Sequence, residues 1–181
     1  MDEITKAAFE NVLFTEQEIK TRIRELATEL AKDFKGKPTS VILLANGALF
    51  FGAELLMGLD LEVQLDIMAV SSYIGVASSN VVTERSDGLK IDIRDRHVVV
   101  VDDIFDTGQT MDHVVQRLKA YGPVDIRVCV LLEKDCAKKV DLRPDYSAFK
   151  IADQFVVGYG LDHNESFRNL PYIAVLDDDG F

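Results

Sequence analysis

The sequence predicts an α/β fold, a central parallel sheet with helices on both of its faces. Two observations favour this class: strand-like and helix-like segments alternate along the chain, and the strand-like segments are continuous apolar runs. Strands of a parallel sheet are buried on both faces, and continuous apolar runs are typical of them. At 181 residues the chain is long enough for one domain, with room beside it only for a small subdomain.

The first element is a helix over residues 15–34, because Thr15 can cap it and Glu18 follows in capping-box register before an apolar stripe. A strand at 40–45 and a helix from Gly47 to about Met57 come next. The other predicted elements are strands at 63–70, 97–101, 124–132, 155–157 and 172–176, a helix at 109–121, and a loop at 74–88 with a weak strand at 80–83. Ligands of such sheets bind at the carboxyl ends of the strands, where Asn46, Asp102 and Lys134 stand.

Composition and charge exclude several classes of protein. The formal net charge of −11 disfavours general binding to nucleic acid, whose phosphates it would repel. No apolar segment approaches the roughly 18 residues of a membrane span, and the acidic N-terminus argues against a secretory signal. We therefore expect a cytoplasmic protein without a membrane partner. Cys129 and Cys136 are expected to be reduced thiols, and with three scattered histidines they offer no zinc-ligand spacing.

Residues 98–110 carry the chemistry. Four valines lead into Asp102 and Asp103, and Asp106 then opens a turn before a helix. Such a strand–turn–helix junction suits a phosphate, because the first backbone N–H groups of a helix lack partners and its dipole favours an anion. Gly108 permits close backbone approach, and the hydroxyls of Thr107 and Thr110 can add donors.

The aspartates make this junction more specific than a plain phosphate loop. Two carboxylates beside a phosphate repel it unless a divalent cation or sugar hydroxyls lie between them. Asp106, inside the turn, can act as a general base. The plainer alternative is that Asp106 only caps the helix while the pair is solvated. Neither the lysine-ended P-loop pattern nor the phosphatase pattern Asp-x-Asp-x-Thr is present.

At this segment the chain resembles the type I phosphoribosyltransferases, whose signature is an apolar strand, two acidic residues, two apolar residues and Asp-Thr-Gly-x-Thr. Downstream, Leu-Leu-Glu-Lys ending at Lys134, Pro-Asp-Tyr at 144–146 and the stretch 155–168 resemble the hypoxanthine/guanine branch. The resemblance covers about residues 40–177. It implies one domain over residues 1–181, with a core at about 38–150 and a small hood from about 1–14 and 151–181.

The resemblance also implies roles for individual residues. The ribose 5′-phosphate part would be bound by Asp102, Asp103, Asp106, Thr107, Gly108, Gln109 and Thr110. The purine would be bound by Lys134, Phe155, Val156 and Asp162, and pyrophosphate by Asn46, Gly47 and Arg168. Magnesium would be held by Asp102, Asp103 and Asp162. Catalysis would involve Asp106 and Lys134, with Ser72 and Tyr73 on a closing loop. The Ala45–Asn46 peptide falls where the family has a sometimes cis bond.

The implied reaction moves ribose-5-phosphate from phosphoribosyl pyrophosphate to N9 of hypoxanthine or guanine, giving IMP or GMP and pyrophosphate. The implied cofactor is Mg²⁺. A lysine that donates to a 6-oxo group selects 6-oxopurines over adenine, whose 6-amino group is a donor. The partners are then phosphoribosyl pyrophosphate and a 6-oxopurine, with no nucleic acid. Family members suggest a homo-oligomer, a dimer or a tetramer.

Three positions depart from the family pattern. Asn46 stands where lysine is common, Asp102 and Asp103 replace a frequent Glu-Asp pair, and Gln109 stands where a basic residue is common. These changes lower the positive charge near the phosphates, and they suggest a heavier reliance on magnesium. Three alternatives stay open: a nucleic-acid-binding regulator that senses phosphoribosyl pyrophosphate, a xanthine-preferring enzyme, and a phosphorelay receiver domain.

Overall fold

The computed structural model describes residues 10–72, 82–84 and 88–176 of the chain. Its main sheet has six strands in the order β4-β3-β2-β5-β6-β7. Strands β3, β2, β5, β6 and β7 are parallel, and β4 pairs antiparallel to β3. These strands are β4 (Val82–Glu84), β3 (Val63–Ser72), β2 (Thr39–Ala45), β5 (His97–Phe105), β6 (Asp125–Asp135) and β7 (Tyr146–Ala152). The predicted central parallel sheet is therefore confirmed.

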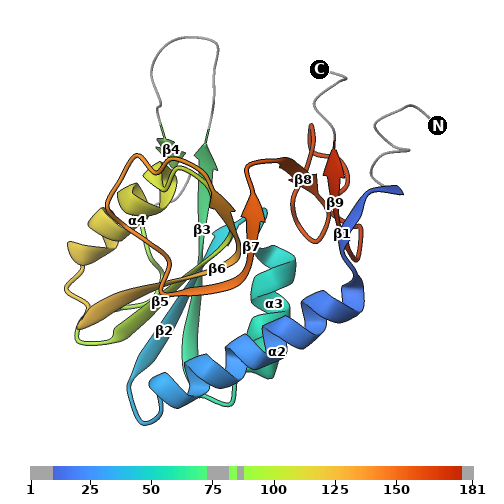
Figure 1. Cartoon of the computed structure of the whole chain (residues 1–181). Helices are drawn as coiled ribbons and strands as arrows, with labels where there is room; N and C mark the ends of the chain where they lie inside the picture. The colour runs from blue at the N-terminus through green and yellow to red at the C-terminus, as the bar shows by residue number, and fades with distance from the viewer. Residues whose placement is uncertain (1–9, 73–81, 85–87, 177–181) are drawn as a thin grey trace.

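Helices cover both faces of this sheet, as predicted (Figure 1). Helices α2 (Glu16–Asp33) and α3 (Leu49–Gly58) lie on one face, and α4 (Gln109–Lys119) lies on the other. Alternate residues of β5 serve the two cores: Val99 and Val101 pack on the α2 side, and Val98 and Val100 pack on the α4 side. This double burial accounts for the continuous run of valines.

A second, three-stranded antiparallel sheet has the order β1-β9-β8. Its strands are β1 (Val12–Phe14), β9 (Ile173–Leu176) and β8 (Phe155–Val157), so segments from both ends of the chain form it. Figure 1 shows this small sheet beside the end of β7, and it corresponds to the predicted hood. The exact division of the chain into core and hood stays a prediction.

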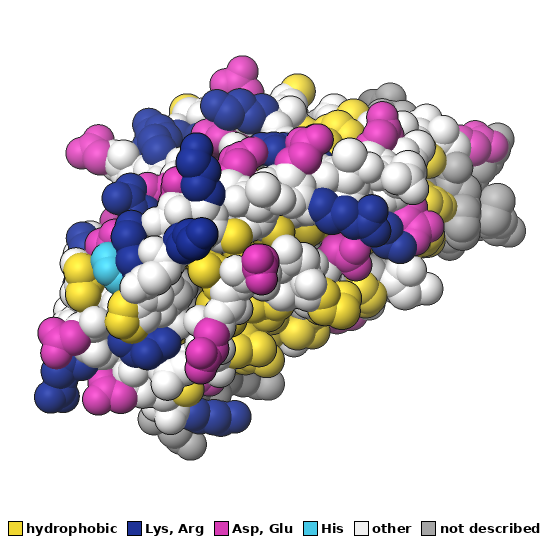
Figure 2. All heavy atoms as spheres, turned by 90° about the horizontal axis from the view of Figure 1, so that it is seen from below, with side chains coloured by type: hydrophobic (Ala, Val, Ile, Leu, Met, Phe, Trp, Pro, Cys, Tyr) yellow, Lys and Arg dark blue, Asp and Glu magenta, His cyan; other side chains and the backbone are white. Residues whose placement is uncertain are grey.

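Exposed hydrophobic side chains gather on α3 and the neighbouring strand β3. They are Leu49, Phe50, Met57, Leu65 and Ile67. Figure 2 shows hydrophobic side chains forming a band on the face seen from below, among acidic and basic groups. Among the described helices, none is long and apolar enough to cross a membrane.

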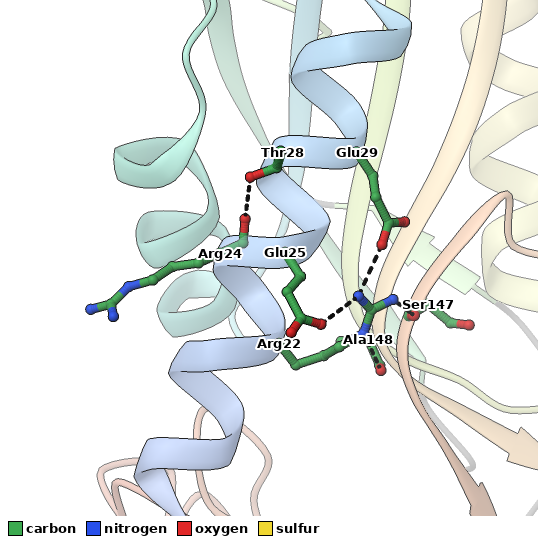
Figure 3. Close-up of polar contacts among 7 residues, drawn as sticks. All are labelled: Arg22, Arg24, Glu25, Thr28, Glu29, Ser147 and Ala148. Atoms are coloured by element: carbon green, nitrogen blue, oxygen red, sulfur yellow. Dashed lines mark hydrogen bonds and ion pairs between the residues drawn. The ribbon is translucent and has the colours of Figure 1, made fainter.

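Helix α2 is fastened to β7, the strand at one edge of the sheet. The Arg22 guanidinium donates to the carbonyl oxygens of Ala148 and Ser147, at 3.0 and 3.3 Å. It also pairs with Glu25 and Glu29 of its own helix (Figure 3). Since exposed sheet edges invite unwanted strand pairing, binding the carbonyls of β7 in this way protects the edge.

The strands are longer than the sequence indicated. β5 continues to Phe105 and β6 to Asp135, so Asp102, Asp103 and Lys134 lie within strands and not beyond their ends. The prediction stopped each strand at its first charged residues, although strand ends that face a ligand site tolerate charge. Strands β1 and β7 were not predicted, because they are short or alternate in polarity. Helix α4 ends at Lys119, and β4 lies at 82–84, of which Val82 and Thr83 fall in the predicted weak strand.

Candidate active site

The junction between β5 and α4 leaves a helix N-terminus open. Gly108 occupies the N-cap position of α4 with φ +86°, and no side chain caps this end. A Cβ atom at Gly108 would lie 2.6 Å from Val140 Cγ2 and 2.7 Å from Phe105 Cζ, so only glycine fits without a shift. The Thr107 carbonyl accepts from the Lys139 backbone at 3.0 Å, which fixes the turn. Because no side chain caps it, this end of α4 can receive an anion.

The two adjacent aspartates lie near the carboxyl end of β5 and are partly buried. The backbone N–H of Asp103 donates to Asp102 Oδ1 at 3.0 Å, and that of Ile104 donates to Asp103 Oδ1 at 2.8 Å. Burial raises the pKa of Asp102 well above its usual range, and the negative charge of Asp103 raises it further. Burial also raises the pKa of Asp103, whereas the nearby Arg168 acts in the opposite direction. A bound cation or a set of sugar hydroxyls would offset this unfavourable charge.

The residues expected at the pyrophosphate end come together around two glycines. The Ala45–Asn46 peptide is cis, as the resemblance implied. A Cβ atom at Gly47 would lie 1.6 Å from Asp103 Oδ2, and one at Gly160 would lie 2.0 Å from the Gly47 carbonyl oxygen. The loop after β2, the acidic pair and the segment after β8 are thus in direct contact, which only glycines at 47 and 160 permit.

Arg168 is held beside this contact by its own segment. Its Nη1 donates to the Gly160 carbonyl at 2.8 Å, and its Nη2 lies 2.8 Å from Asp162 Oδ1 and 2.9 Å from Glu165 Oε2. Asp162 and Arg168 therefore form an ion pair with each other at the edge of the site. A phosphate that meets Arg168 has to share it with these two carboxylates.

Lys134, the residue expected to meet the purine 6-oxygen, lies close to Asp106. Lys134 Nζ lies 3.9 Å from Asp106 Oδ2, and the Cys136 thiol donates to Asp106 Oδ1 at 3.1 Å. Phe155 is 39% exposed and meets the His163 ring edge-on at 5.8 Å between centroids, whereas Val156 is buried. Because its ring is partly exposed, Phe155 is not a core aromatic.

The segment that carries Arg168 has an unusual backbone. Tyr159, Asn164, Glu165 and Phe167 all have positive φ angles between 50° and 73°. Such angles are uncommon for residues other than glycine, and they cluster at functional sites. The backbone angles thus indicate a functional role for residues 159–167, independently of their side chains.

Two of the expected residues, Ser72 and Tyr73, fall at the edge of the described part of the chain. Ser72 ends β3, its side chain is outside the described part of the chain, and Tyr73 lies outside the described residues. The structure also brings in residues that the sequence analysis did not single out for the site: Cys136, Asp153, Gly160 and Glu165. Only Gly160 and Glu165 carried a signal, because they stand inside the stretch 155–168 that had been singled out.

Comparison with known proteins identifies the family. A family model described as the phosphoribosyl transferase domain matches residues 11–164. The chain belongs to the phosphoribosyltransferase family. A hypoxanthine-guanine-xanthine phosphoribosyltransferase of Tritrichomonas foetus is 40% identical over 168 residues, which are 92% of this chain and 91% of that protein. A hypoxanthine-guanine phosphoribosyltransferase of Streptococcus pneumoniae is 40% identical over 169 residues, 93% of each chain.

Solved structures agree with the sequence relatives. A hypoxanthine phosphoribosyltransferase of Staphylococcus aureus superposes with a TM-score of 0.89 at 35% identity, covering 98% of this phosphoribosyltransferase and 96% of that chain. A hypoxanthine-guanine phosphoribosyltransferase of Bacillus anthracis gives a TM-score of 0.85 at 33% identity, with 93% and 98% covered. The resemblance to the hypoxanthine/guanine branch and the predicted fold are both confirmed.

Proposed function

We propose that this phosphoribosyltransferase transfers ribose-5-phosphate from phosphoribosyl pyrophosphate to N9 of hypoxanthine or guanine in purine salvage. The products are IMP or GMP and pyrophosphate. One observation carries the proposal: Asp106, an acceptor, and Lys134, a donor, lie 3.9 Å apart next to the open N-terminus of α4. A 6-oxopurine presents the complementary pair, an N–H at N7 beside the oxygen at C6.

The binding roles follow from the positions of the groups. The first turn of α4, with Thr107, Gly108, Gln109 and Thr110, receives the 5′-phosphate. Asp102 and Asp103 meet the ribose hydroxyls, where their charge also favours a ribose that gains positive character in the transition state. Phe155 stacks on the purine and the backbone of Val156 contacts it. Asp106 takes the proton from the base as N9 attacks the anomeric carbon, and Lys134 donates to the 6-oxygen.

The acidic pair suits a magnesium ion. Mg²⁺ is commonly held by one or two carboxylates together with substrate phosphates, and Asp102 and Asp103 are two neighbouring carboxylates whose pKa values burial raises. Among the described residues no group of three potential metal ligands occurs, so the substrate would have to complete the coordination. When bound, the ion neutralises charge on the departing pyrophosphate. Asp162 forms no such group with this pair and is proposed to bind magnesium separately, at the pyrophosphate end of the site.

The leaving pyrophosphate meets Asn46, Gly47 and Arg168. Arg168 supplies positive charge there, and the closeness of Gly47 to Asp103, a proposed ribose ligand, supports this role for the loop after β2. We expect Ser72 and Tyr73 to belong to a segment that closes over the reaction centre and excludes water.

The preference among 6-oxopurines stays open. Lys134 accounts for the 6-oxo group and does not discriminate at the 2-position. A relative that is 40% identical is named for xanthine as well as hypoxanthine and guanine, which keeps a xanthine-preferring enzyme as the alternative. The regulator alternative has less support, because the net charge of −11 opposes nucleic acid.

We further propose that the enzyme is a cytoplasmic homo-oligomer, a dimer or a tetramer. The exposed apolar side chains on α3 and β3 support association, since large contiguous apolar patches on a protein surface mark interaction sites. Sedimentation at several protein concentrations tests this.

Initial rates with adenine, hypoxanthine, guanine and xanthine, each with phosphoribosyl pyrophosphate and Mg²⁺, test the activity. We expect pyrophosphate release with hypoxanthine or guanine and a much lower rate with adenine. Turnover of adenine alone, or of no base, would overturn the assignment.

A further inference from the structure

Lys134 lies between two carboxylates that come from different elements. Its Nζ is 3.3 Å from Asp153 Oδ1 and 3.9 Å from Asp106 Oδ2. The Lys134 side chain is 13% exposed, so its ammonium group has little freedom to turn to water, while Asp153 and Asp106 are 63% and 51% exposed. The lysine is thus within hydrogen-bond distance of Asp153 and beyond that distance from Asp106.

This asymmetry bears on substrate binding. If Lys134 and Asp106 paired directly, each would occupy the group that the purine needs, and binding would have to break that pair. Asp153 supplies the lysine with a second carboxylate, which lies closer to the ammonium group than Asp106 does. The other oxygen of Asp106 accepts from the Cys136 thiol at 3.1 Å. Each member of the proposed pair therefore has its nearer contact with a residue other than its partner.

The position of Asp153 adds a second link. Asp153 lies between the end of β7 at Ala152 and the start of β8 at Phe155. Lys134 pairs with Ile151 in the register of β6 and β7, which brings the turn after β7 over the lysine. The contact between Asp153 and Lys134 therefore joins the lysine to the segment that presents the exposed Phe155 ring.

We propose that Asp153 is a positioning residue that keeps the Lys134 ammonium group off Asp106, so that both remain available to one 6-oxopurine. The inference rests on the proposed function, because it takes Asp106 as the base and Lys134 as the donor to the 6-oxygen. Asp153 itself does not touch the reacting atoms.

The first test compares the Michaelis constants of two substrates in an Asp153→Asn variant. We expect the KM for hypoxanthine to rise about five-fold, the scale of an exposed ion pair, with the KM for phosphoribosyl pyrophosphate unchanged. Asp153→Glu keeps the charge and should recover most of the loss. Asp135→Asn is the matched control, because Asp135 follows Lys134 in β6 and points to the opposite face of the sheet. Circular dichroism confirms that each variant is folded.

A double-mutant cycle decides whether Asp153 acts through the lysine. In a Lys134→Met background, Asp153→Asn should cause no further change in kcat/KM for hypoxanthine. A full five-fold loss in that background would overturn the positioning role, as would an unchanged KM for hypoxanthine in Asp153→Asn. If the unaltered chain turns over no purine base, both this inference and the proposed function fail. An active chain with an unaffected Asp153→Asn variant overturns this inference alone.

Discussion

The N-termini of α2 and α4 differ in whether a side chain of the protein caps their first backbone N–H groups. Both helices begin with backbone N–H groups that have no partner within the helix. At α2 the chain supplies the partners: Thr15 accepts from the Glu18 backbone, and Glu18 accepts from the Thr15 backbone at 2.9 Å. At α4 the cap is Gly108, which has no side chain. The capped terminus of α2 stabilises the fold, and the terminus of α4, which no side chain caps, is the one that we propose receives a phosphate.

The carboxylates beside the two helix N-termini also differ, in the direction of their pKa shifts. Hydrogen bonds from Thr15 hold the pKa of Glu18 below its usual range. Burial instead raises the pKa of Asp102 and of Asp103. Hydrogen bonds from the protein favour the charged form of the carboxylate at α2, whereas burial disfavours the charged forms of the pair before α4. We therefore expect the charge at α2 to serve folding and the pair before α4 to serve substrate binding.

Asp106→Asn is expected to have the largest effect on the open terminus. Loss of the proposed base should lower kcat by roughly 10²–10⁴-fold, the range for general base catalysis, with KM values nearly unchanged. Steady-state kinetics with hypoxanthine measures both constants. Asp112→Asn, a carboxylate-to-amide change within the first turn of α4, is the control and should behave like the parent. Unaltered turnover in Asp106→Asn would remove Asp106 as the base.

Asp102→Asn should separate binding from stability. Loss of one charge from the pair should raise the KM for phosphoribosyl pyrophosphate by about 10-fold or more, the scale of a hydrogen bond to a charged group. The ligand-free enzyme should melt at a higher temperature at neutral pH, because a buried charge has been removed. A raised pKa in the folded state means that the ionised Asp102 carboxylate lowers the free energy of unfolding at pH values above the folded pKa. The gain in melting temperature should therefore disappear as the pH falls below the ordinary aspartate value of 3.8. A lower melting temperature at neutral pH would contradict this account.

Substitutions of Gln109, in the first turn of α4, should have smaller effects, and the direction should depend on the charge that is introduced. Gln109→Glu should raise the KM for phosphoribosyl pyrophosphate by about 10-fold through repulsion of the 5′-phosphate, and Gln109→Lys should lower it. Gln109→Glu should nevertheless make the protein more stable and Gln109→Lys less stable, because an acidic residue in the first turn favours the helix by about 0.3–1 kcal/mol. Gln17→Glu, in the first turn of α2, is the matched control: it should gain stability with no change in KM. Equal changes in the KM for phosphoribosyl pyrophosphate in Gln109→Glu and Gln17→Glu would contradict the distinction between the two helix N-termini.

The closed terminus was easier to predict from the sequence than the site around the open one. The capping pattern of α2 and its apolar stripe are local, so residues 15–34 were predicted to within one residue at each end. The turn from Asp106 to Thr110 was also predicted, because a strand, a glycine and a helix start follow one another directly. In both regions the decisive contacts lie within a few residues of each other.

The rest depends on contacts between distant segments. Asp153 reaches Lys134 only through the pairing of β6 with β7, and β7 alternates between polar and apolar residues as an edge strand does. Gly160 reaches Gly47 across more than half of the chain. Local patterns carry no information on such pairings, so the roles of Asp153 and Cys136 became visible only once the sheet order was known.

Thr15→Ala should have the smallest effect and should spare activity altogether. Removal of an N-cap side chain typically costs about 1 kcal/mol, which lowers the melting temperature of a chain of this size by roughly 2–4 °C. Because the pKa of Glu18 is lowered in the folded state, its contribution is present above the ordinary value of 4.5 and is lost as the pH falls through the folded value. The difference in melting temperature between parent and variant should therefore narrow in acid. Thermal melts from pH 7 to pH 3, with kcat/KM measured at pH 7, test both parts. A change in kcat/KM would mean that the closed terminus of α2 also serves the reaction, which would remove the distinction between the two helices.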